Sequence, residues 1–168
     1  MAFLLIIVAV LLRLVPHPAN FAPVAALALF GGVYLDKRWA LILPLAAMLM
    51  SDIFIGFYTW QVMASVYISF ALVGLIGLWV RKHKKAAVVI GATLSGSILF
   101  FLITNFAVWA FGMMYPHTLQ GLITSYVAGI PFFRNTLLGD YFYVGLFFGS
   151  YELVMALAAK RRGVAERA

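Results

Sequence analysis

The chain has 168 residues, of which 65% are hydrophobic and only 10% charged, and its mean hydropathy is +1.06. Soluble globular domains contain about 25% charged residues, so this composition excludes an ordinary soluble domain and predicts an integral membrane protein. The net charge of +7 does not indicate nucleic-acid binding, because the basic residues stand in short clusters between apolar runs. Such clusters orient membrane spans and contact anionic membrane lipid. Cysteine is absent, which excludes disulfides and thiolate metal sites.

The first apolar run, residues 1–12, ends at Arg13 and is followed by Pro16 and Pro18, which break a helix. No basic segment precedes this run, so we expect a retained short span rather than a cleaved signal peptide. Further apolar runs occupy about residues 21–35, 39–57, 62–80, 86–111 and 136–159. Several approach the roughly 20 residues that a helix needs to cross a bilayer. The sequence therefore predicts one all-α membrane domain, 1–168, that is a polytopic bundle of six transmembrane helices.

The distribution of basic residues agrees with this alternation of spans. Ten of the twelve follow the second, fourth and sixth predicted spans: Lys37, Arg38, Arg81, Lys82, Lys84, Lys85, Lys160, Arg161, Arg162 and Arg167. Cytoplasmic loops are enriched in lysine and arginine. We therefore expect a multi-pass protein of the cytoplasmic membrane with both termini in the cytoplasm.

Between the fifth and sixth spans, apolar residues recur at the spacing of one helix face: Leu119, Leu122, Ile123, Tyr126, Val127 and Ile130. This segment is too short to cross a bilayer. The pattern predicts an extra amphipathic helix on the outer side of the membrane, separate from the sixth span. Residues 112–135 would then form either a lid over the outer mouth of the bundle or a structural cap, and the pattern fits both.

Placing the predicted spans side by side gathers the rare polar side chains in the outer third of the membrane. These candidate site residues are Arg13, Asn20, Asp52, Asn105, Trp109, Arg134, Asn135 and Asp140. In one interpretation they line an outward-facing pocket, with an arginine for a carboxylate or phosphate and an aspartate for a cationic group. In the other, Arg13 pairs with Asp52 or Asp140 and Arg134 pairs with the remaining aspartate, without any ligand. Asn135 has a further alternative as the N-cap of the sixth span.

No P-loop, zinc-protease helix, nucleophile elbow or dinucleotide fingerprint occurs in the sequence. We therefore expect no enzymatic activity and no cofactor or metal centre of the protein's own. Gly145 and Gly149 form a G-x-x-x-G pair in the sixth span, a pattern that allows close contact between membrane helices.

Several stretches together resemble an uncharacterised family of small six-span bacterial transport proteins. They are residues 13–23, 26–32, 51–52, 104–109 and 131–140. The layout that this family implies is similar to that of the S components of energy-coupling factor vitamin transporters. The resemblance implies capture of a small-molecule substrate, either a vitamin-like molecule or a metal, from outside the bacterial inner membrane. It also implies a partner, a transmembrane coupling subunit with its ATPases. Many S components dock through an Ala-x-x-x-Ala surface on the first span, whereas here Ala9 is followed four positions later by Arg13.

Three hypotheses follow. The first is a membrane substrate-binding or transport protein of the S-component type. The second is an ion-coupled secondary transporter that works alone, with Asp52 or Asp140 as the titrating group. The third is a membrane scaffold or assembly subunit without a small ligand.

Overall fold

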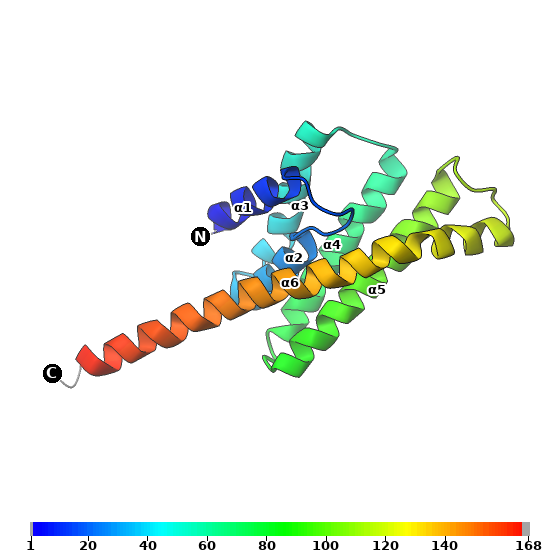
Figure 1. Ribbon diagram of the computed structural model, residues 1–168. Helices are drawn as coiled ribbons and strands as arrows, with labels where there is room; N and C mark the ends of the chain where they lie inside the picture. Colours follow the sequence, from blue (N-terminus) through cyan, green and yellow to red (C-terminus); the bar gives the residue numbers. More distant parts are fainter. Residues whose placement is uncertain (1, 166–168) are drawn as a thin grey trace.

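The computed structural model describes the backbone of residues 2–165 and the side chains of residues 4–160, and the regular structure in this part of the chain is entirely α-helical (Figure 1). The helices are α1 (Ala2–Leu14), α2 (Val24–Tyr34), α3 (Trp39–Ile55), α4 (Trp60–Val80), α5 (Ala86–Phe111) and α6 (Leu119–Ala165). The prediction of a helical protein is therefore confirmed.

Three of these helices are long and apolar enough to cross a membrane: α4, α5 and the Leu119–Lys160 part of α6. Helices α1, α2 and α3 are apolar but shorter. Large apolar side chains are exposed along the long helices, for example Leu102 at 48% and Phe142 at 56%. A surface of this kind is compatible with lipid rather than with water. The length and surface of these helices indicate a membrane protein.

Helix α2 is the centre of the structure, and all of its residues from Val24 to Val33 are buried. It contacts α3, α4 and α6. Glycines allow α2 and α4 to approach closely: a Cβ atom added to Gly32 would lie 2.6 Å from the backbone of Gly77. A Cβ added to Gly74 would likewise lie 2.2 Å from the carbonyl oxygen of Ala40 in α3. Close packing of α2, α3 and α4 therefore depends on the missing side chains of these glycines.

The glycine pair that the sequence singled out does not make the close contact. A Cβ added to Gly145 or Gly149 would meet nothing within 4 Å among the residues described. A G-x-x-x-G spacing shows where another helix could approach, but it does not show whether one does.

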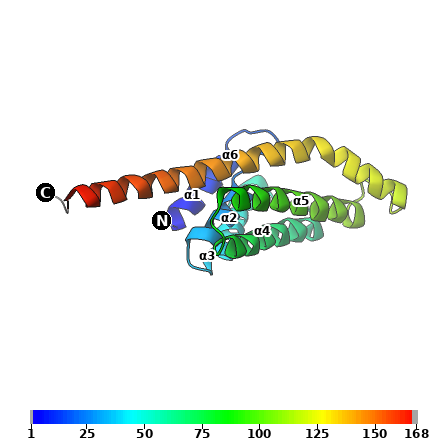
Figure 2. The same cartoon turned by 90° about the horizontal axis from the view of Figure 1, so that it is seen from below.

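The prediction of a separate amphipathic helix before the sixth span is wrong, because α6 continues without interruption from Leu119 to Ala165, a length of 47 residues. Pro131 lies inside this helix. Its nitrogen carries no hydrogen to donate to the backbone oxygen four residues earlier. Figure 2 shows that α6 bends in this region. Membrane helices tolerate an internal proline because neighbouring groups can satisfy the freed carbonyl. The predicted start of the sixth span near residue 136 is therefore wrong.

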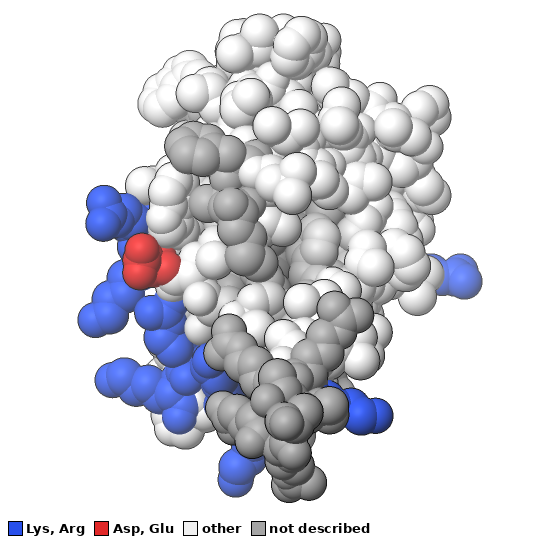
Figure 3. Space-filling view, turned by 90° about the vertical axis from the view of Figure 1, so that its left-hand side faces the viewer, with Lys and Arg blue, Asp and Glu red and all other residues white. Residues whose placement is uncertain are grey.

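The loops 35–38 and 81–85 lie together at one end of the molecule, which we call the basic end. The backbone oxygen of Gly32, near the end of α2, accepts a hydrogen bond of 2.9 Å from Arg81 Nε. Lysine and arginine side chains gather on one part of the face in Figure 3, and most of the rest of that face is uncharged. The opposite end, where α1 and α3 finish, is called the pocket end.

Candidate functional site

The first polar cluster at the pocket end is an ion pair between α1 and α3. Arg13 Nη1 lies 2.8 Å from Asp52 Oδ1, donates to the backbone oxygen of Met48 at 3.3 Å and donates to the hydroxyl of Ser51. The other carboxylate oxygen of Asp52 accepts a hydrogen bond of 2.9 Å from the hydroxyl of Tyr67 in α4. The side chain of Asp52 is only 1% exposed. Of the pairings that the sequence allowed, the structure forms the one between Arg13 and Asp52.

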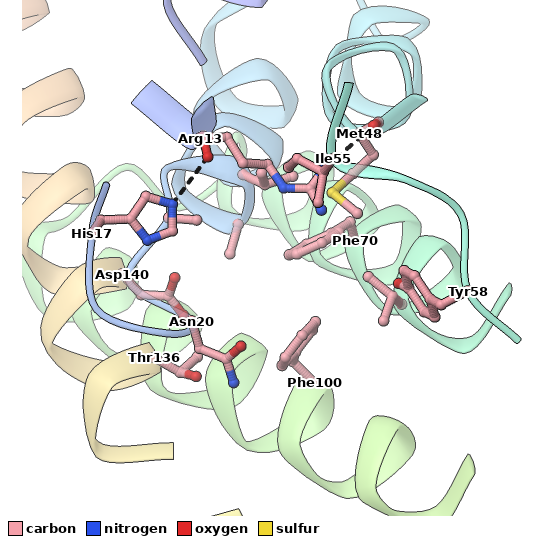
Figure 4. A pocket seen from close by; sticks show the side chains of 14 residues that line it. Arg13, His17, Asn20, Met48, Ile55, Tyr58, Phe70, Phe100, Thr136 and Asp140 are labelled. Atoms are coloured by element: carbon pink, nitrogen blue, oxygen red, sulfur yellow. Dashed lines mark hydrogen bonds between the residues drawn. The ribbon is translucent and has the colours of Figure 1, made fainter. Parts of the chain in front are cut away.

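Beside this pair lies a cavity of about 260 Å³, which we call the main cavity. Its polar lining comes from α1, the following loop and α6, and consists of Arg13, His17, Asn20, Thr136 and Asp140. Its aromatic lining includes Tyr58, Phe70 and Phe100. Figure 4 shows Asp140 and Thr136 on one side of the cavity and Phe70 and Phe100 on the other. Such a mixture of apolar walls and a few polar groups is typical of small-molecule sites.

Asp140 is the deepest charged group of the main cavity. It is 4% exposed, and its Oδ2 accepts a hydrogen bond of 2.6 Å from the hydroxyl of Ser97 in α5. Among the side chains of residues 4–160, the pair of Arg13 with Asp52 is the ion pair that forms, and no basic side chain pairs with Asp140. Asp140 therefore contributes a carboxylate with no partner of opposite charge in the described part of the chain.

A second cavity of about 260 Å³ adjoins the main one and shares Asn20 and Thr136 with it. Asn105 lines this adjoining cavity, and its side-chain amide donates to the carbonyl of Phe101 at 2.8 Å. Asn20 has a φ of 64°, a left-handed conformation that asparagine tolerates better than most residues. The two cavities and the residues that they share define the candidate site.

A protein-family model, described as a family of unknown function (DUF6580), matches residues 1–162. The chain belongs to this family. No curated protein and no solved structure matches it. The description of DUF6580 assigns no activity.

The structure brings some of the predicted site residues of the DUF6580 protein together and leaves others outside. Arg13, Asn20 and Asp140 line the main cavity, Asp52 holds Arg13, and Asn105 lines the adjoining cavity.

Arg134 is exposed and lines neither cavity. In one continuous helix, Arg134 and Asp140 are six residues apart and point in directions that differ by about 120°. The two side chains therefore cannot both face the main cavity, and the predicted pairing of Arg134 with an aspartate does not form among the residues described.

Asn135 and Trp109 fix segments of the pocket end rather than line the cavities. Asn135 Nδ2 donates to the carbonyl of Ala19 at 3.1 Å and so ties α6 to the loop after α1. The N-cap alternative for Asn135 is wrong, because this residue lies in the interior of α6. Trp109 Nε1 donates to the carbonyl of Pro116 at 3.1 Å, which holds the loop between α5 and α6.

The segment predicted as a lid or cap packs along the end of α5. Tyr126 donates through its hydroxyl to the carbonyl of Leu102 at 2.9 Å, and Ser125 donates to the carbonyl of Asn105, also at 2.9 Å. Residues of the predicted apolar stripe are exposed, including Leu119 at 74% and Val127 at 58%. Tyr126 belongs to the same stripe, so one part of the stripe packs on α5 and the rest stays exposed within the described chain.

The site residues predicted from the sequence did not include His17, Thr136 or the aromatic residues of the main cavity, nor the hydrogen-bond partners Ser97 and Tyr67. Thr136 could have been found, because it precedes Asp140 by four residues and so shares a helix face with it. Ser97 and Tyr67 gave no such signal, since serine and tyrosine are common in membrane helices and only the fold brings them to Asp140 and Asp52.

A hollow of about 470 Å³ lies at the basic end between α2, α5 and α6. It is lined by Tyr34, Lys84, Lys85 and Glu152 among others. The hydroxyl of Tyr34 donates to Glu152, and Lys84 Nζ lies 4.8 Å from the centre of the Tyr34 ring. Glu152 is therefore held within the chain, at the end of the molecule away from the main cavity.

Proposed function

We propose that this DUF6580 protein is a membrane substrate-binding or transport protein that holds a small solute in the main cavity. The observation that carries the proposal is the main cavity itself, where buried Asp140 and half-buried Arg13 converge on an aromatic-lined space. Ionisable side chains within membrane segments are costly and commonly mark a pathway or a ligand site. The volume of about 260 Å³ lies just below the roughly 300 Å³ at which ligand pockets begin, so the solute is small.

The proposal includes an orientation in the bacterial inner membrane. The six helices are taken as six spans, with the basic end in the cytoplasm, where positively charged loops prefer to lie. Both termini are then cytoplasmic, and the main cavity takes up solute from the extracytoplasmic side. In this arrangement the protein is similar in layout to an S component, and a transmembrane coupling subunit with ATPases would be its partner.

A substitution that fills the cavities tests the proposal. Val66 lines both cavities, whereas Ile68, two residues further along α4, is 55% exposed. A screen of purified protein in detergent against vitamins, vitamin precursors, amines and divalent metals is expected to find a compound that raises the melting temperature. At a concentration of 100 times its Kd, a ligand adds about 2.7 kcal/mol of stability. We expect V66W to abolish this rise and I68W to preserve it.

Two outcomes would contradict the proposal. One is that no compound of the screen stabilises the protein. The other is that the stabilisation persists in V66W, which would place the ligand elsewhere on the molecule.

The same site favours one second candidate, an ion-coupled carrier that acts alone. A buried carboxylate without a basic partner in the described chain is a group that a proton can neutralise, and Asp140 is such a group. Uptake of the identified solute into liposomes that contain only this protein, without ATP, would support the carrier. Uptake that requires added coupling subunits and ATP would support the S-component type.

A further inference from the structure

The carboxyl group of Asp140 has no direct cationic partner among the described side chains that line the main cavity. Arg13 is paired with Asp52 at 2.8 Å, so its charge is already offset within the protein. Both ring nitrogens of His17 lie near backbone oxygens, 2.9 Å from that of Pro18 and 3.2 Å from that of Arg13, rather than near the carboxylate of Asp140. Among the described residues, the hydrogen bond to the side chain of Asp140 comes from the hydroxyl of Ser97. No basic side chain among those described forms an ion pair with Asp140, so a negative charge on its carboxylate would have no direct protein partner.

Burial makes an unpaired negative charge on Asp140 costly. Asp140 is 4% exposed, in a segment long and apolar enough to cross a membrane. An ionised carboxylate in such surroundings is strongly unfavourable unless a cation accompanies it. A ligand that brings its own positive charge would supply the missing partner, and a charge-assisted hydrogen bond to the carboxylate would hold it.

The remaining walls of the cavity fit an organic cation better than a metal ion. Phe70 and Phe100 are stacked at 5.2 Å between ring centroids, and both line the cavity. Aromatic faces attract organic cations, and they also accept an apolar body. A metal ion of the calcium type needs six or more oxygen ligands. Among the described side chains that line the cavity, Asp140 supplies the carboxylate oxygens. The hydroxyl of Thr136 already donates a hydrogen bond to the carbonyl of Phe132 at 3.0 Å. The lining therefore offers fewer oxygen ligands than such a metal ion needs.

We propose that the main cavity selects a small organic monocation, an amine with an apolar or aromatic body, whose ammonium group binds the carboxylate of Asp140. This inference rests on the proposed function and narrows it to one class of solute. In the bound state the ammonium group donates to Asp140, and the body of the ligand lies against Phe70 and Phe100. Arg13 stays paired with Asp52, so it attracts a carboxylate ligand less strongly than an unpaired arginine would.

The test compares probes that share an apolar body and differ in the charge of the head group. The full chain, purified in detergent, is titrated with 2-phenylethylamine, 2-phenylethanol and 3-phenylpropionate, and then with butylamine, butanol and pentanoate. Binding is measured by calorimetry at a pH at which the amines are protonated. We expect each amine to bind roughly ten- to hundredfold more tightly than its matched alcohol, as expected for a hydrogen bond to a charged group, and each acid to bind more weakly than the alcohol.

Two variants locate the effect. D140N keeps the size of the side chain and an acceptor for Ser97 but removes the charge, and it is expected to reduce the gap between amine and alcohol to near onefold. E152Q removes an equal charge from the basic end, outside the cavity, and is expected to leave the gap unchanged. The melting temperature of each variant without ligand shows that it is folded.

The inference is overturned if alcohols or acids bind as well as the amines, if D140N keeps the gap, or if E152Q loses it as well. If none of the six probes binds, the broader screen can still yield a ligand whose stabilising effect is lost in V66W. The charge of that ligand then tests the inference. A neutral or anionic ligand would overturn the inference and leave the proposed function intact. If no ligand at all is found, the proposed function fails and this inference fails with it.

Discussion

Replacing Arg13 with methionine is expected to lower the free energy of unfolding by about 3–5 kcal/mol, the range measured when one partner of a buried ion pair is removed. The carboxylate of Asp52 is 1% exposed and would be left with only the hydroxyl of Tyr67 as a partner. Methionine replaces the aliphatic part of the arginine side chain and stays compatible with the packing of α1 on α3. Unfolding in mixed micelles, followed by circular dichroism over a denaturing-detergent series, measures the loss.

The double variant R13M/D52N is the control. It removes both charges, and the asparagine retains an acceptor for the hydroxyl of Tyr67. We expect the double variant to recover most of the lost stability, because neutral replacement of both partners of a buried pair is often tolerated. A single variant as stable as the parent, or a double variant no better than the single, would show that the pair does not hold α1 to α3.

A matched pair of glycine substitutions is expected to give effects of opposite sign. G74A places a Cβ atom 2.2 Å from the backbone oxygen of Ala40, so α3 and α4 have to move apart. Overpacking of this kind costs about 1–3 kcal/mol and occasionally more. G145A is the same change at a helix position where nothing lies within 4 Å, and it should gain up to about 1 kcal/mol from the better helix propensity of alanine.

The same unfolding series measures both glycine variants. Stability of G74A equal to that of the parent would mean that α3 and α4 are not in backbone contact. A marked loss in G145A would mean that this face of α6 is covered by a second copy or by another protein.

The helical character of the chain followed from its apolar runs, and the ends of α4 and α5 lie within about two residues of their predicted positions. The merging of two predicted segments into α6 did not follow. Pro131 has no amide hydrogen to donate, and the sequence alone does not show whether a neighbouring group replaces the lost bond. The contacts of Ser125 and Tyr126 with α5 stabilise the part of the helix before Pro131, and they depend on tertiary packing.

The sequence predicted only part of the candidate site, because the rest also depends on tertiary packing. Depth along each span could be estimated from the rise per residue, and it brought Arg13, Asp52 and Asp140 to one end of the molecule. The sixth span was predicted to begin at about residue 136, so one helix did not fix the direction of Arg134 relative to Asp140. Arg134 was therefore expected at the site, although it faces outward. The partners Ser97 and Tyr67 depend on which helices are neighbours, a property of the fold rather than of any single segment.

Helix α6 supplies Asp140 to the main cavity and, twelve residues later, Glu152 to the contact with Tyr34 at the basic end. The two side chains are held roughly 18 Å apart along one helix axis, and backbone hydrogen bonds resist any change in that spacing. Because the helix is continuous, a displacement of Asp140 along the helix axis is transmitted to the later turns of the helix. We expect it to shift Glu152 relative to Tyr34, so that ligand occupancy at the pocket end would alter a contact at the basic end.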